Sequence, residues 1–113
     1  MNYDIVVVPE FERMVKRLQR KYRHIKEYLL TLKQFLPENP RAGDAISGLH
    51  GKVFKVRLSS SDLERGKSGG LRVIYYFAQT HQHIYLLLIY SKSEKENIRV
   101  KEIVKLLKQY GLW

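Results

Sequence analysis

Cysteine is absent from this chain of 113 residues, so disulfide bonds and thiolate chemistry are excluded. That absence fits a reducing compartment. No apolar run is long enough to cross a membrane. The short apolar run near the start follows an acidic residue and meets Pro9, which is unlike a signal peptide. We therefore expect a cytoplasmic protein with no membrane partner.

Acidic residues are also scarce. The chain has 11 Asp and Glu against 21 Lys and Arg, a net charge of +10. Such a surplus on a small protein favours an anionic partner, most commonly nucleic acid, with an acidic protein as the alternative. The composition, 44% hydrophobic and 28% charged, excludes a disordered chain. The length fits one domain spanning residues 1–113.

The common arrangements of catalytic residues are missing as well. There are four histidines, but His81 and His83 stand in a polar turn without the spacing of metal ligands. No serine, histidine and acid constellation stands out, and no pair of carboxylates forms an acid/base dyad. We expect neither a metal nor a cofactor. A catalytic site would have to use Lys, Arg and Tyr, which restricts the reaction to one on a phosphate.

The pattern of apolar residues predicts the order of the elements. Proline occurs at three positions, and Pro37 and Pro40 end a helical segment. A β-branched run predicts a strand at 3–8, and alternating or apolar segments predict strands at 52–59, 71–78 and 83–90. Apolar residues at helical spacing predict helices at 9–22, 25–36 and 94–110. Ser93 is the expected cap of the last helix. The last strand is apolar on both faces, which predicts a central position in the sheet. The fold class is therefore α+β, with an N-terminal strand and helical hairpin, an antiparallel meander and a C-terminal helix.

Cations cluster on the predicted meander. Lys55 and Arg57 stand two residues apart on one strand, so they project from the face opposite Phe54 and Leu58. Alone, they are best explained as a solvated sheet face. Arg72, however, begins the neighbouring strand, and a meander brings the two strands side by side. Cations without nearby acids repel one another, so the cluster is more easily understood if it holds a phosphate.

Two flanking segments add to this cluster. The loop "LERGKSGG" places Arg65 and Lys67 among glycines just before the Arg72 strand, and its glycine spacing is not that of a P-loop. We assign both cations to RNA binding. The segment "IYSKSEKEN" places Tyr90, Lys92 and Lys95 between the last strand and the last helix.

Three segments, "NPRAGDAISGLHGKVFKVRL", "GKSGGLRVIYYF" and "YLLLIYSKSEKENI", resemble in order those of the RelE/ParE superfamily of bacterial toxins, especially its HigB-like branch. The resemblance implies a RelE-like fold and the toxin of a type II toxin–antitoxin system. It implies a ribosome-dependent messenger-RNA endonuclease that inhibits translation and is neutralised by a cognate antitoxin, expected to be a helix-turn-helix protein. Operator DNA would be bound only through the antitoxin complex.

The resemblance also implies the chemistry. In such enzymes the 2′-hydroxyl of the ribonucleotide attacks the adjacent phosphate, with no metal required. By position, Lys55 and Arg57 match the two strand cations of RelE-like toxins, Arg72 matches the arginine of the next strand, and Lys92 and Lys95 fall in the basic stretch after the final strand.

The roles follow from elementary chemistry. The guanidinium of Arg72 suits the phosphate oxygens. Lys55 is the candidate general base if crowding by cations favours its neutral form. Lys92 or Lys95 would protonate the leaving group or hold RNA. The tyrosine that RelE-like members carry in the last helix has no match, and Tyr90 is its positional substitute. The general acid and base therefore stay open.

Two other functions fit the same fold. A ParE-like toxin would poison DNA gyrase by binding, without catalysis. A non-catalytic nucleic-acid-binding module would use the charge only for affinity. The presence of Lys55, Arg57 and Arg72 together favours the nuclease.

Overall fold

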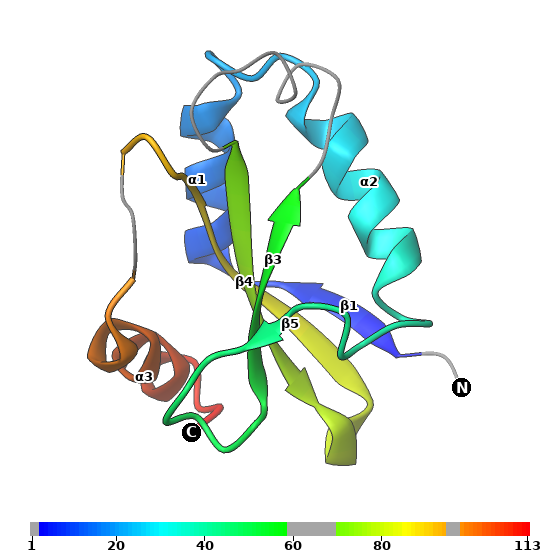
Figure 1. Cartoon of the computed structure of the whole chain (residues 1–113), viewed down its shortest axis with the longest axis vertical. Helices are drawn as coiled ribbons and strands as arrows, with labels where there is room; N and C mark the ends of the chain where they lie inside the picture. Colours follow the sequence, from blue (N-terminus) through cyan, green and yellow to red (C-terminus); the bar gives the residue numbers. More distant parts are fainter. Residues whose placement is uncertain (1–2, 59–69, 95–97) are drawn as a thin grey trace.

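The structure, a computed structural model, describes residues 3–58, 70–94 and 98–113. Figure 1 shows the arrangement of helices and strands. The elements are β1 (Asp4–Val7), α1 (Pro9–Leu18), α2 (Ile25–Phe35), β2 (Asp44–Ala45), β3 (Val53–Leu58), β4 (Leu71–Ala78), the 3-10 turn η1 (Gln79–His81), β5 (His83–Ser91) and α3 (Val100–Gln109). This order confirms the predicted α+β class. No helix of the described segments has the length and apolarity needed to cross a membrane.

The five strands described form one sheet in the order β1-β5-β4-β3-β2. Strands β3, β4 and β5 make the predicted antiparallel meander. β5 lies between β1 and β4, which confirms its predicted central position. β1 pairs with β5 in parallel, and the two-residue strand β2 pairs with β3; the alternation of apolar residues predicted neither pairing.

Both ends of α1 carry residues that favour a helix at this place. Pro9 occupies the first turn, where its missing N–H costs nothing, with acidic residues beside it and basic residues in the last turn. Phe11, Val15 and Leu18 are its buried residues and face the core. α1 and α2 run in opposite directions, as expected for a helical hairpin (Figure 1).

The two faces of the sheet are covered by different parts of the chain. The Tyr75 hydroxyl contacts residues just after α2, and the Ser91 hydroxyl meets the Tyr22 hydroxyl just after α1. We call this side the α1/α2 face. Trp113 packs edge-on against Tyr76, which points the other way because successive side chains of a strand alternate. We call that side the Trp113 face.

The final helix begins later than the sequence predicted. α3 starts at Val100, and Arg99 rather than Ser93 precedes it. The prediction that Ser93 caps this helix is wrong. The Ser93 hydroxyl lies 2.7 Å from the Ser91 hydroxyl, and its backbone N–H also donates to that oxygen at 3.3 Å. The serine is therefore used in the turn that closes β5.

Tyr75 is a fully buried residue of the core. Its hydroxyl donates to the Pro40 carbonyl at 2.8 Å and accepts from the Gly43 N–H at 3.1 Å. Tyr75→Phe is expected to lower the free energy of unfolding by about 1–3 kcal/mol, because two partly buried backbone groups lose their hydrogen bond. Burial also raises the pKa of Tyr75. Since the unfolded phenol ionises first, this contribution to stability should decline above about pH 10. Urea unfolding of the wild type and of Tyr75→Phe, at neutral pH and at roughly pH 10.5 to 11, measures both effects. Equal free energies of unfolding for the two proteins at neutral pH, or the same difference between them at both pH values, would contradict these expectations.

Candidate functional site

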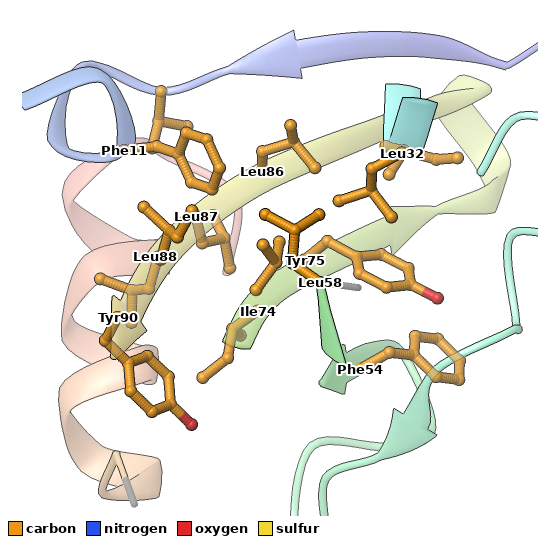
Figure 2. Packing of buried hydrophobic residues seen from close by; sticks show 14 of the residues in the cluster. Phe11, Leu32, Phe54, Leu58, Ile74, Tyr75, Leu86, Leu87, Leu88 and Tyr90 are labelled. Carbon is orange, nitrogen blue, oxygen red and sulfur yellow. The ribbon is translucent and has the colours of Figure 1, made fainter. Parts of the chain in front are cut away.

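Three side chains form a row across the meander. Arg57 of β3 lies directly opposite Arg72 of β4, and Arg72 lies opposite Tyr90 of β5. The prediction that the meander brings Arg57 and Arg72 together is confirmed. Lys55 lies two residues from Arg57 on the same face, opposite Ile74. Figure 2 shows Ile74 and Tyr90 directed away from the side occupied by Leu86, so the row lies on the Trp113 face.

A β-bulge sets the third member of this row. Ala78 pairs with His83, and counting six residues back along β4 and six forward along β5 would pair Arg72 with Ile89. The register shifts between Ile74 and Tyr75, so that β5 holds one extra residue, Leu87. Tyr90 therefore takes the place beside Arg72. A one-residue slip would have turned a buried isoleucine toward the cations instead.

Arg72 is buried although it carries a charge, since only 9% of its surface is exposed. Burial lowers the pKa of Arg72, and the neighbouring charge of Arg57 lowers it further. Its Nη1 donates to the Leu71 carbonyl at 3.4 Å. Arg57 is exposed, so the pair presents one fixed and one accessible guanidinium. An anion between them would offset their repulsion.

Tyr90 is buried beside this pair, with 4% of its surface exposed. Its hydroxyl is the one buried side-chain polar atom of the described residues without a hydrogen-bond partner. Burial raises the pKa of Tyr90, and the charge of Arg72 opposes this rise. The phenol therefore keeps its proton at neutral pH and is available as a donor. A buried donor with no partner is uncommon and requires an explanation.

The end of β5 is held at the same edge of the sheet. The backbone N–H of Lys92 donates to the Gly70 carbonyl at 3.0 Å, which ties the turn after β5 to the start of β4. On the α1/α2 face, the Ser91 hydroxyl lies 3.2 Å from the Tyr22 hydroxyl, and this contact holds the turn in place. The sequence interpretation missed both supporting residues. A serine at the end of an apolar strand was the only available signal for them.

The described residues contain no group of three His, Asp or Glu side chains that could hold a metal ion. The Nδ1 of His83 instead lies 3.2 Å from the Tyr85 hydroxyl. Arg65, Lys67 and Lys95, the predicted RNA-binding residues, lie outside the described segments.

This fold and this row of side chains define a small, basic α+β protein with a cation cluster suited to a phosphate. A family model described as the RelE toxin of the RelE/RelB toxin–antitoxin system matches residues 12–111. The chain therefore belongs to the RelE toxin family, whose members are toxins of toxin–antitoxin systems. Among solved structures, the chain is similar to a double arginine-to-alanine mutant of the E. coli toxin RelE in the free state. The identity is 16%, the TM-score is 0.61, and the match covers 96% of this chain and 98% of that one. At this identity, the likeness supports the fold alone.

Proposed function

We propose that this chain is a ribosome-dependent messenger-RNA endonuclease of the cytoplasm, inhibited by a cognate helix-turn-helix antitoxin. The single observation that carries the proposal is the row of Arg57, Arg72 and Tyr90, which combines two phosphate ligands with a buried proton donor. Membership of the RelE toxin family supports it. The HigB-like branch remains a prediction, as does binding to operator DNA through the antitoxin complex.

The proposed reaction uses groups of the chain and of the RNA only. The 2′-oxygen of a ribonucleotide forms a bond to the adjacent phosphorus, and the bond from phosphorus to the 5′-oxygen breaks. Arg72 and Arg57 bind the phosphate oxygens and stabilise the charge that builds up on them. The products are a cyclic phosphate and a 5′-hydroxyl, so the proton lost by the 2′-oxygen balances the proton gained by the 5′-oxygen.

Two protons must be moved by positioned groups. We assign proton delivery to Tyr90, because burial keeps its phenol protonated. Lys55 is the proposed base, since it lies on the same face as Arg57 and is only half-buried. Lys92 lies exposed at the same edge of the sheet, where it is suited to contact the RNA backbone. Arg65, Lys67 and Lys95 remain proposed RNA-binding residues.

A ParE-like toxin is the second candidate, because the shared fold alone does not require catalysis. A gyrase poison would need no proton donor at the cation cluster. The buried, unpartnered hydroxyl of Tyr90 is the specific observation that favours the nuclease over this alternative.

Expression of the chain is expected to arrest growth while translated messages are cut. Primer extension on messenger RNA after induction should show new 5′ ends within coding regions, and these should disappear when translation is blocked first. Intact messages together with loss of DNA supercoiling would replace the nuclease by the gyrase poison.

A further inference from the structure

The Trp113 face carries aromatic side chains as well as the row of cations. Tyr76 lies on this face, four residues beyond Arg72 on β4. The indole of Trp113 packs edge-on against the Tyr76 ring, with ring centres 6.0 Å apart, and the imidazole of His50 stacks on the indole at 5.6 Å. We call His50, Tyr76 and Trp113 the aromatic platform. The reaction proposed above uses none of these three side chains.

The end of α3 fixes the position of the indole. The helix closes with a Schellman motif, in which Gly111 has a φ of +71° and its N–H donates to the Lys108 carbonyl at 3.0 Å. The N–H of Leu112 donates to the Leu107 carbonyl at 2.8 Å. This motif turns the chain out of the helix, and Trp113 follows two residues after the glycine. Backbone hydrogen bonds therefore hold the segment that places the indole over the sheet.

The imidazole of His50 is placed by an uncommon backbone conformation. The φ of His50 is +58°, and it lies between Gly48 at +86° and Gly51 at +68° in the turn before β3. Residues other than glycine are uncommon in this region and lower the stability of the folded state there. The His50 ring nevertheless lies almost flat on Trp113, at an interplanar angle of 26°. A glycine would suit this turn at least as well, so the turn alone does not require the ring.

The platform rests on the core and is still open to solvent. Val53, opposite Tyr76 on β3, is fully buried. Tyr85, opposite Tyr76 on β5, packs nearly parallel to it at 5.9 Å. Tyr76 itself is half-buried, His50 is exposed, and Trp113 is 36% exposed. Rings that are held in place and partly exposed can stack with a further flat ring without a large loss of conformational entropy.

The platform and the cations lie at two places on the same face. The four residues from Arg72 to Tyr76 span about 13 Å along β4. That distance corresponds to about four stacked nucleotides of one strand. Ile74, between them, is buried, so the two places are separate contact surfaces. Proteins that bind single-stranded nucleic acid combine the same two features, cations for the phosphates and aromatic rings for the bases.

We infer that the aromatic platform stacks with bases of single-stranded RNA, a few nucleotides from the phosphate bound by Arg72. Other sheets with exposed aromatic side chains bind unstacked bases in this way. The excess of positive charge, +10 for the chain, favours a strand that carries phosphates. The inference rests on the RNA-binding part of the proposed function. Because every base has a flat face, the platform should add affinity for single strands without choosing a sequence.

The test compares two strands that differ only in their bases. One is a short single-stranded oligouridylate, and the other is an abasic strand of equal length with the same number of phosphates. The wild type should bind the oligouridylate more tightly, and added salt should weaken both complexes while this difference persists, because stacking does not depend on the phosphates. Trp113 is the only tryptophan of the chain, so the oligouridylate should change its fluorescence directly.

Three variants locate the binding. Trp113→Leu should weaken binding of a labelled oligouridylate roughly 10-fold and leave binding of the abasic strand unchanged, whereas Trp113→Phe should restore most of the affinity. Phe35→Leu is the matched control, because Phe35 is an aromatic residue of α2 that is 46% exposed and lies outside the platform. Fluorescence anisotropy gives each Kd, and circular dichroism checks folding.

His50→Gly separates binding from folding. Glycine readily adopts the positive φ of this position, so the variant should fold like the wild type and yet bind the oligouridylate more weakly.

Equal binding of the two strands by the wild type, or equal Kd values for Trp113→Leu and Phe35→Leu, would overturn the inference. So would a wild-type dimer that Trp113→Leu dissociates while RNA binding stays the same, since a second copy would then cover the platform. Cleavage on programmed ribosomes is measured separately. A wild type that binds bases through Trp113 but cuts no message would remove the nuclease proposal and support the platform.

Discussion

Replacing Arg72 by methionine is expected to slow cleavage roughly 100- to 1000-fold, the loss seen when one donor to a developing oxyanion is removed. Methionine has a similar length without the charge, so the buried space around position 72 stays largely filled. Arg72 is 9% exposed, and burial lowers its pKa. The buried charge therefore lowers the stability of the folded protein. The free energy of unfolding of Arg72→Met should therefore stay within about 1 kcal/mol of the wild-type value.

The matched control for this variant is Arg17→Met, because Arg17 is an exposed cation near the end of α1. This change removes the same charge from the chain but leaves the site intact. It should alter only long-range attraction to RNA, a difference that added salt removes. Single-turnover cleavage on programmed ribosomes measures both variants, with circular dichroism as the check on folding. Equal rates for two folded variants would remove Arg72 from the site.

Much of the fold follows from local pattern. The alternation of apolar residues in 53–58 predicted which side of β3 carries Lys55 and Arg57, and the doubly apolar run in β5 predicted its central position. Such predictions succeed because the side-chain period of a strand is fixed by backbone geometry. The start of α3 was misplaced because a serine before acidic residues satisfies its hydroxyl equally well in a turn.

The site was predictable only in part, and the reason is the register of one hairpin. Local pattern brings β3 beside β4, and hence Arg57 close to Arg72. The partner of Arg72 on β5 depends on the bulge at Leu87, and no turn residue in the sequence predicts that bulge. The burial of Arg72 was also out of reach, because it depends on parts of the chain far from it in sequence. A basic strand residue therefore looked like a surface cation.

The bulge in β5 places Tyr90 beside Arg72, and the hydroxyl of Tyr90 has no hydrogen-bond partner there. The core alone gains nothing from the Tyr90 oxygen, since its neighbours among the described residues offer it no hydrogen bond. Leaving a buried hydroxyl without a partner costs about 1–3 kcal/mol. The Tyr90 hydroxyl therefore lowers the stability of the fold, but it lies in one row with Arg72 and Arg57. A phosphate bound by the arginines would find a hydrogen-bond donor there.

Replacing Tyr90 by phenylalanine is accordingly expected to separate function from stability. Cleavage should slow roughly 100-fold or more, the typical contribution of a positioned proton donor. The free energy of unfolding should stay the same or rise by about 1 kcal/mol, in contrast to its fall for Tyr75→Phe, where two hydrogen bonds are lost. Tyr85→Phe is the matched control, since Tyr85 lies on the same strand five residues away and contacts His83 rather than the arginines.

The pH dependence gives an independent measurement of the same group. Because burial raises the pKa of Tyr90 above the ordinary value of about 10, its proton stays bound between about pH 6 and 9, and this group should add no step to the rate profile there. The charge of Arg72 lowers the pKa of Tyr90, so Arg72→Met should raise it further. Tyrosine ring carbon shifts in NMR spectra, followed through an alkaline titration, report this change directly. Wild-type cleavage by Tyr90→Phe would exclude the hydroxyl from the reaction. An unchanged titration of Tyr90 in Arg72→Met would show that the two side chains do not interact.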